Sequence, residues 1–294
     1  MNASTADPTR IRFTPSFIAR LELLVGRSTA RRGRWEEAGR AMQVGAGDEF
    51  VGHRPYRPGD ELRDLDWNLL ARFDEPFVRV YRRGAGERWT ILFDTSASMG
   101  LGRPAKLQSA AEIATGLAFS GLGEGAGVRL LAATEEGPRI HGLQRRSELA
   151  GWLKFMEGLR ATGTAGLRAL LAPLGRNAGE RVFLVGDLLD VQPAEVAALA
   201  RPGRSLDLVR VLAPRELEPV GPDGSAPAEV EWLDPETGER LGVALDGDVR
   251  RRYENELQTH LERWRETCAR HRVAHGVWSS ARPFEDVVRG VLFP

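Results

Sequence analysis

The pattern of apolar and polar residues changes at Trp89, where it becomes strongly periodic. From there on, short apolar runs typical of buried strands alternate with longer segments in which apolar residues recur every three or four positions. The run at 89–94 ends in Asp94, and a segment with one apolar helical face follows from Pro104. This alternation of strands and helices predicts an α/β fold.

The same pattern continues to the C-terminus. Further strands are predicted at 128–133, 140–143, 182–187, 206–212 and 273–278. Further helices are predicted at 147–159, 166–174, 193–200, 249–271 and 283–291. Pro, Gly and acidic residues interrupt the alternation at 214–247, which predicts a small β-hairpin insertion. The sequence therefore predicts a doubly wound, mostly parallel sheet of the Rossmann type.

The region before the periodic part predicts little regular structure. Apolar residues at helical spacing predict a short helix at 15–25, whereas 26–50 is rich in Arg and Gly and 51–88 also lacks periodicity. We therefore expect two parts, an N-terminal helix with an irregular arm at 1–88 and the α/β domain at 89–294.

The composition excludes some classes of function and of site. Lys and Arg together number 41 and Asp and Glu together number 41, so the formal net charge is zero, whereas a general nucleic-acid binder needs a basic face. Among the basic residues only Lys106 and Lys154 are lysines. Cys268 is the only cysteine, which excludes an intramolecular disulfide and a cysteine-built zinc site.

The apolar runs of the sequence bear on export and membrane insertion. No apolar run approaches 18 residues, so we expect no transmembrane helix. No apolar segment follows a basic start at the N-terminus, so we expect no secretory signal and a cytoplasmic protein.

The candidate chemistry lies in the loops that follow strands. Asp94 ends the first core strand, and Ser96 and Ser98 follow at alternate positions, where extended backbone points side chains the same way. Thr164 lies in a Gly-Thr loop before a helix, and Asp187 ends a later strand. Ligands of doubly wound sheets bind outside the carboxyl ends of the strands. Hydroxyl and carboxylate oxygens there predict a site for Mg²⁺ or Mn²⁺.

These five residues resemble the metal-ion-dependent adhesion site of von Willebrand factor A domains, and the resemblance covers residues 89 to about 290. It implies that Ser96 and Ser98 ligate the ion directly and that Thr164 does so in one state of the site. It implies that Asp94 and Asp187 act directly or through water.

A second set of residues lies in the arm: Arg54-Pro55-Tyr56, Pro58-Gly59-Asp60, Arg63 and Asp66-Trp67. This set resembles the signature of the bacterial family called domain of unknown function 58, in which such an arm precedes a von Willebrand factor A-like domain. The resemblance implies a partnership with a MoxR-type AAA+ ATPase, or with its client, in the assembly or maturation of other proteins.

The leading hypothesis is a protein-interaction module rather than an enzyme, in which a carboxylate of the partner completes the coordination of the ion. One alternative is a magnesium-dependent phosphatase with Asp94 as nucleophile, although Ser96 stands where such an enzyme places its second carboxylate. Another is a metal-free scaffold in which the same loop is held by hydrogen bonds.

The arm motif also has a purely structural interpretation. Asp60 is expected to cap a short helix that begins at Glu61, and Asp64 and Asp66 to pair with arginines. Trp67 is then a packing anchor on the main sheet. The alternative is that the arm contributes to a surface for a partner.

Overall fold

The computed structural model describes residues 7–24, 49–56, 65–73, 75–82, 88–174, 180–218, 230–244 and 246–293. Contacts divide the chain into two compact units. The sheet unit comprises Met1–Leu24 and Glu87–Pro294, and the small unit comprises Val25–Gly86.

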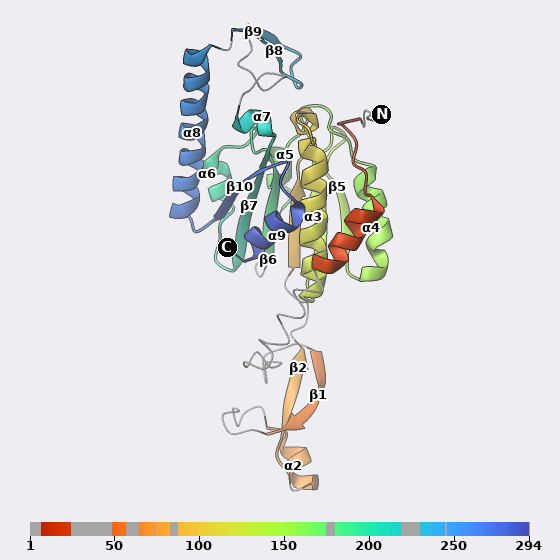
Figure 1. The fold of residues 1–294 in the computed structure, drawn as a ribbon. Coiled ribbons are helices and arrows are strands. Elements are labelled where there is room, and N and C mark those ends of the chain that lie inside the picture. The colour runs from red at the N-terminus through yellow and green to blue at the C-terminus, as the bar shows by residue number, and fades with distance from the viewer. Residues whose placement is uncertain are drawn as a thin grey trace. The chain divides into compact units, whose positions relative to one another are not determined.

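The sheet unit is built on one central sheet with the strand order β10-β7-β6-β3-β4-β5 (Figure 1). The strands are β3 (Arg88–Phe93), β4 (Gly127–Ala132), β5 (Arg139–Leu143), β6 (Glu180–Gly186), β7 (Arg204–Leu212) and β10 (Ala274–Ser279). All neighbours pair in parallel except β4 with β5 at one edge. The predicted doubly wound, mostly parallel sheet is therefore confirmed.

The strand order places a switch point at β3. From β3 the chain proceeds to β4 on one side and later returns to β6 on the other. In folds of this kind, ligands bind outside the carboxyl ends of the strands at such a switch point. Asp94 follows β3 and Asp187 follows β6, so both lie at the carboxyl ends of the two switch-point strands.

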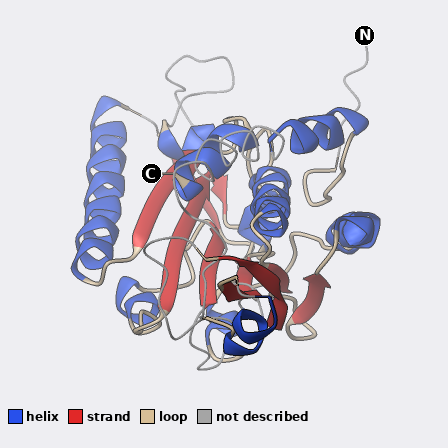
Figure 2. Cartoon of the chain, turned by 90° about the horizontal axis from the view of Figure 1, so that it is seen from below, coloured by secondary structure: helices blue, strands red, loops and turns tan. Residues whose placement is uncertain are grey.

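Helices cover both faces of the sheet (Figure 2). The longer ones are α3 (Lys106–Gly123), α4 (Leu149–Glu157), α8 (Gly247–Arg270) and α9 (Phe284–Leu292). Trp152 of α4 donates a hydrogen bond to the Thr115 hydroxyl of α3 at 3.1 Å, and α3 contacts α9, so these three share a face. On the other face, Trp264 of α8 packs in a buried cluster with Leu170, Val196 and the apolar residues of the sheet.

Among the shorter helical segments of this unit are η2 (Ala97–Gly100), η3 (Arg146–Glu148), α5 (Arg168–Leu171) and α6 (Pro193–Ala197). Most of the predicted boundaries differ from those observed by a few residues, as two helices illustrate. The helix expected from Pro104 begins at Lys106, because Ala105 is still extended. The helix expected at 166–174 is confined to α5.

The predicted insertion contains a short helix and a hairpin. The helix is α7 (Pro214–Leu217), and the hairpin pairs β8 (Val230–Leu233) antiparallel with β9 (Arg240–Val243). Figure 1 shows the hairpin beyond α7, at the end of the unit where β7 finishes.

The N-terminal helix, described over residues 15–24, belongs to the sheet unit. The ring of Phe17 packs against the ring of Phe284 in α9 with centroids 4.8 Å apart. Burial of Phe17, Leu21 and Leu24 fixes this helix, and their helical spacing is the pattern that predicted it.

The small unit is more regular than the irregular arm that the sequence predicted. β1 (Glu49–Pro55) pairs antiparallel with β2 (Phe77–Arg82), and α2 (Trp67–Phe73) lies between them in sequence. Most of segment 26–50, together with Pro58, Gly59, Asp60, Glu61, Arg63 and Asp64, lies outside the described residues.

Asp66 of the arm motif has a structural role, although its partners among the described residues are not arginines. Its Oδ1 accepts hydrogen bonds from the backbone N–H groups of Asn68 and Leu69 at 3.0 and 3.2 Å, which caps the start of α2. Its Oδ2 lies 2.9 Å from Nε2 of His53 in β1. Asp66 therefore joins the helix to the strand pair.

Trp67 follows Asp66, and its side chain is 61% exposed. Substitution Trp67→Ala should therefore change the free energy of unfolding by no more than about 0.5 kcal/mol, as at other surface positions. Urea denaturation of the full chain measures this. A loss of more than about 2 kcal/mol would instead identify Trp67 as a packing anchor.

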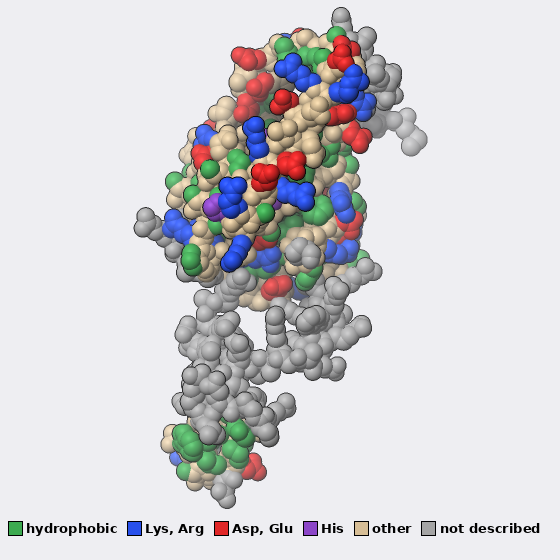
Figure 3. Space-filling model, turned by 90° about the vertical axis from the view of Figure 1, so that its left-hand side faces the viewer, with side chains coloured by type: hydrophobic (Ala, Val, Ile, Leu, Met, Phe, Trp, Pro, Cys, Tyr) green, Lys and Arg blue, Asp and Glu red, His purple; other side chains and the backbone are tan. Residues whose placement is uncertain are grey.

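Two surface properties bear on possible partners. On the face shown in Figure 3, acidic and basic side chains are interspersed rather than gathered into one basic patch, which agrees with the neutral net charge. Within the described ranges, none of the helices has the length and apolar content needed to cross a bilayer.

Candidate functional site

The site begins at the end of β3. The backbone N–H of Asp94 donates to the Val185 carbonyl at 3.0 Å, so the pairing of β3 with β6 continues one residue beyond the strand. The Asp94 Oδ1 atom then accepts a hydrogen bond from the Ser96 N–H at 2.9 Å, and this turn leads into η2, which carries Ser98. Local hydrogen bonding therefore places the carboxylate and the two hydroxyls together.

The neighbouring strand delivers the second carboxylate. Asp187 follows Gly186, and its Oδ2 accepts a hydrogen bond from the Ser98 hydroxyl at 2.8 Å. The hydroxyl oxygens of Ser96 and Ser98 are 3.0 Å apart. The structure thus brings together four of the five predicted residues, all of them buried.

Gly186 makes this close approach possible. A Cβ atom added at this position would lie 2.5 Å from the Cβ and 2.7 Å from the Oδ2 of Asp94. Only glycine leaves enough room for the Asp94 side chain between the two strands.

Thr164 is the predicted residue that does not join the group. Its loop is held against the serine loop, because the Thr162 N–H donates to the Thr95 carbonyl at 3.0 Å and the Ala97 N–H donates to the Gly163 carbonyl at 2.9 Å. The Thr164 side chain is exposed, and within the described part of the chain its hydroxyl makes no hydrogen bond to the other four residues. A role for Thr164 as ligand stays a prediction.

Asp94 is electrostatically the most unusual residue of the group. Its side chain is fully buried, and its Oδ2 has no hydrogen-bond partner among the described residues. Burial raises the pKa of Asp94 well above its ordinary value, and the nearby Asp187 carboxylate raises it further. Asp190 adds a third carboxyl group, whose pKa burial and Asp187 also raise.

Lys106, at the start of α3, is the site residue that the sequence analysis missed. Its side chain is fully buried, and its Nζ donates to Asp187 Oδ2 at 2.9 Å and to Glu216 Oε1 of α7 at 2.6 Å. Burial alone lowers the pKa of Lys106, but the Asp187 and Glu216 carboxylates outweigh it, so the net shift is upward. The sequence offered one signal for this residue, because Lys106 is one of only two lysines in an arginine-rich chain.

The donor set can be tested for its fit to a divalent cation. The single proton of the Ser98 hydroxyl is taken by Asp187, and Asp94 Oδ2 is left without a donor. Two hydroxyls and two carboxylates are hard oxygen ligands of the kind that Mg²⁺ and Mn²⁺ prefer. The residues therefore fit such an ion, and Lys106 supplies part of the positive charge in its absence.

No alternative metal centre emerges from the described residues, in which no group of three or more His, Cys, Asp and Glu side chains is placed to hold an ion. Cys268 is buried in α8, and burial raises the pKa of its thiol to about 11, so it is an unreactive packed residue.

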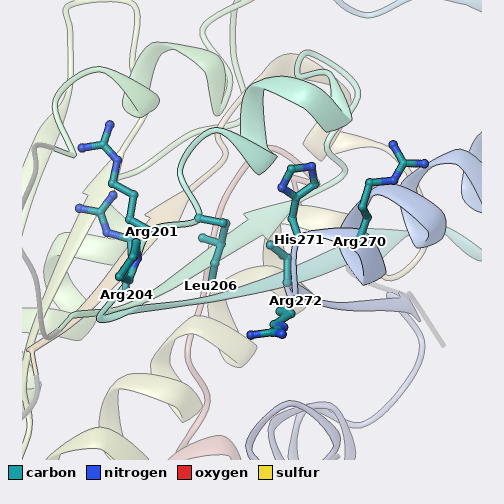
Figure 4. A pocket seen from close by; sticks show the side chains of 9 residues that line it. Arg201, Arg204, Leu206, Arg270, His271 and Arg272 are labelled. Carbon is teal, nitrogen blue, oxygen red and sulfur yellow. The ribbon is translucent and has the colours of Figure 1, made fainter.

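One hollow, of about 610 Å³, lies away from the switch point, where β7 begins and α8 ends (Figure 4). It is lined by Arg201, Arg204, Arg270, His271 and Arg272, among others, and Arg204 pairs with Glu180 at 3.4 Å. Figure 4 shows the arginine side chains pointing in different directions rather than toward one point. This hollow contributes nothing to the carboxylate and hydroxyl group at the opposite end of the strands.

Comparison with known proteins finds relatives in mycobacteria. Uncharacterized proteins of Mycobacterium tuberculosis and Mycobacterium bovis are 28% identical over 188 residues, which is 59% of this chain and 58% of each relative. The chain thus spans less than two thirds of the length of these relatives.

Among solved structures, the von Willebrand factor A domain titled SpRpn10 is similar, with a TM-score of 0.40, 14% identity, and coverage of 70% of this chain and 95% of that one. A family model matches residues 52–263, a segment that begins within β1, includes α2 and β2 of the small unit, and continues through the sheet unit from β3 into α8. The chain therefore belongs to the family described as protein of unknown function DUF58.

Proposed function

We propose that this protein is a non-enzymatic interaction module that holds Mg²⁺ or Mn²⁺ at the switch point and uses it to bind a carboxylate of a protein partner. The observation that carries the proposal is the convergence of Asp94, Ser96, Ser98 and Asp187, with Asp94 Oδ2 buried and without a partner among the described residues. A buried acceptor of this kind needs either a donor or a cation.

The ligand types suit adhesion rather than hydrolysis. When bound, the ion supplies a Lewis-acidic position that attracts an outside Asp or Glu. Neutral hydroxyls at Ser96 and Ser98 leave more of its charge available than carboxylates would. Complete burial of Asp94, and Ser96 in place of a second carboxylate, argue against a phosphatase nucleophile at this position.

The partner proposed here follows from the resemblance of the arm motif and of the site. It is a MoxR-type AAA+ ATPase or its client, which would offer an acidic side chain to the site. The family membership supports this choice only through that resemblance.

A second candidate, a metal-free scaffold, is favoured by one specific contact. The buried Lys106 ammonium lies 2.9 Å from Asp187 Oδ2, where it already neutralises one of the two carboxylates. In this alternative the loop holds its shape by hydrogen bonds, and the partner recognises the shape of the loop.

Titration calorimetry with MgCl₂ and MnCl₂ tests the proposal. The wild-type chain should bind one ion, and Asp94→Ala should weaken binding by at least about a hundredfold, since even outer-shell residues typically contribute about 10- to 100-fold. Asp248→Ala removes an exposed carboxylate at the start of α8 and should leave the affinity unchanged. Absence of binding by the wild type would eliminate the metal-dependent function and leave the scaffold.

A further inference from the structure

Arg210 is a charged residue in the apolar layer between α8 and the sheet. It lies near the end of β7, and its side chain is 1% exposed. Its Cζ atom is 4.7 Å from the centroid of the Trp264 ring in α8. Trp264 belongs to the buried cluster that also contains Leu206 and Leu208 of β7. The guanidinium is therefore enclosed between a helix and the sheet.

Arg210 lacks the counter-charge that other arginines of the sheet have in contact. Arg181 pairs with Asp207 at 2.8 Å, and Arg129 pairs with Glu180 at 2.9 Å. Nε and Nη2 of Arg210, by contrast, are buried and have no hydrogen-bond partner among the described residues. Burial lowers the pKa of Arg210 to about 10, so the guanidinium is still charged at neutral pH. A buried charge of this kind needs a partner.

Two acidic groups act on the charge of Arg210 without filling this place. Asp187 attracts the charge, but its Oδ2 accepts from Lys106 at 2.9 Å and its Oδ1 accepts from the Leu189 N–H at 3.2 Å. The Cys268 thiol, whose pKa burial raises to about 11, is uncharged at neutral pH. The part of the chain that the structure describes therefore supplies no anion in contact with Arg210.

Further nitrogen atoms without partners lie around Arg210. Within the described ranges, the buried Nε1 of Trp264 and Nε2 of His275 make no hydrogen bond. The rings of these two residues have centroids 6.0 Å apart. His275 of β10 pairs in register with Leu208, which is two residues from Arg210 on β7, so these three side chains share one face of the sheet. Both α8 and β10 therefore bring nitrogen atoms into the layer that holds Arg210.

These groups select an anion with two oxygen acceptors. Nε and Nη2 lie along one edge of a guanidinium, where two parallel N–H groups bind both oxygens of a carboxylate. The indole N–H of Trp264 can only donate. Burial and the Arg210 charge lower the pKa of His275 to about 4, so this imidazole is neutral at neutral pH. A carboxylate therefore matches both the fork of donors and the single positive charge.

The burial of Arg210 and Trp264 limits the size of the ligand. Their side chains are 1% and 0% exposed, so a carboxylate on the surface of a partner protein does not reach the guanidinium. His275 is half-buried, and so is His260, which lies one turn before Trp264 in α8. The layer thus meets solvent on the side of the two histidines, where a small anion can enter.

We propose that the chain binds a small free carboxylate between α8 and the β7–β10 edge of the sheet, held by both N–H groups of the Arg210 fork and by the Trp264 indole N–H. The anion would join the helix to the sheet, because Arg210 belongs to β7 and Trp264 to α8. The site uses none of the residues proposed to hold a divalent ion, so it does not depend on the proposed function.

NMR of the full chain in EDTA tests this proposal, because the chelator removes any divalent ion that could bind the probe. Sodium acetate is titrated at an ionic strength held constant with sodium chloride, and the Trp264 indole signal, assigned with Trp264→Phe, reports binding. Acetate should shift this signal with a dissociation constant of about 1–10 mM, whereas chloride alone should not.

Two lysine variants form a matched pair in this titration. Arg210→Lys keeps the charge but loses the fork, so it should bind acetate at least about tenfold more weakly than the wild type. Arg282→Lys changes an exposed arginine that also lies over a tryptophan ring, at 5.0 Å from the Trp278 centroid, and should bind acetate like the wild type.

Urea unfolding in EDTA supplies a second readout. Acetate should raise the urea midpoint of the wild type and of Arg282→Lys, but not that of Arg210→Met, which has no cation. Without acetate, the midpoint of Arg210→Met should be no lower than that of the wild type, because the variant buries no unpaired charge. A lower midpoint would contradict the proposal, since it would show that the guanidinium is already paired in the free protein.

Two further results would overturn the proposal. If acetate neither shifts the indole signal nor raises the midpoint of the wild type, or if it acts equally on Arg210→Met, Arg210 holds no carboxylate. If the peptide Gly-Asp-Gly binds at Arg210 and acetate does not, the ligand is a side chain of a protein rather than a small free anion. All of these outcomes are independent of the calorimetric test of the metal site.

Discussion

In the Lys106→Met variant, the free energy of unfolding measured in chelator should fall by about 3–5 kcal/mol, the typical effect of removing one member of a buried ion pair. Methionine preserves most of the volume of the side chain but leaves Asp187 and Glu216 without their shared ammonium. Asp187 then lies buried beside Asp94 with no neutralising charge in contact. Urea denaturation of the full chain, with EDTA present, measures the loss.

The same variant separates the two functional proposals. If the site is built for a divalent ion, Mg²⁺ should restore part of the stability of Lys106→Met and should bind it more tightly than the wild type, because the competing ammonium is gone. Lys154→Met is the matched control, since the only other lysine is exposed on α4 and its loss should change stability by about 0.5 kcal/mol or less. Equal stability of the two variants would show that the Lys106 ion pairs contribute nothing.

In the Asp94→Asn variant, we expect metal-free protein at neutral pH to have a larger free energy of unfolding than the wild type. Burial and the Asp187 carboxylate raise the pKa of Asp94, so the folded state disfavours the ionised form relative to the unfolded state. Asparagine keeps the shape and carries no charge. Thermal unfolding in EDTA measures the gain.

The pH dependence of this gain has a definite sign. Below the carboxyl's unfolded pKa, near 3.8, Asp94 is protonated in both states and contributes no difference. As the pH rises from there through the raised folded value, the wild type loses stability that the Asn variant keeps. In Mg²⁺ the order should reverse, because only the wild type gains binding energy. An Asn variant less stable than the wild type in EDTA at every pH would contradict the assignment.

The sheet unit could be predicted from the sequence because its signals are local. Apolar runs such as 89–94 and 182–187 end in an acidic residue at the carboxyl end of a strand. Helices with one apolar face separate these runs. Asp94, Ser96, Ser98 and Asp187 were found for the same reason, since each lies at a strand end or within two turns of one. The binding of a metal ion and the identity of the partner stay predictions.

The small unit was harder to predict because its order is not local. The alternation in β2, with Val78 buried, is a strand signal, but β2 pairs with β1 across an intervening helix and the irregular spacing of prolines and arginines obscured it. Lys106 was missed for a related reason. Nothing near Lys106 in the sequence indicates that it faces Asp187, because that requires the start of the helix to be placed in three dimensions.

The backbone hydrogen bond from Asp94 to Val185 makes the geometry of the site depend on the alignment of β3 with β6. Side chains alternate between the two faces of a sheet, so a slip of one residue between β3 and β6 would send Asp94 to the opposite face from its partners. Gly186 would then no longer lie beside it, and a different residue would occupy that position. The carboxylate and hydroxyl group therefore exists in one alignment of the two strands, and its presence reports that the centre of the sheet has formed correctly.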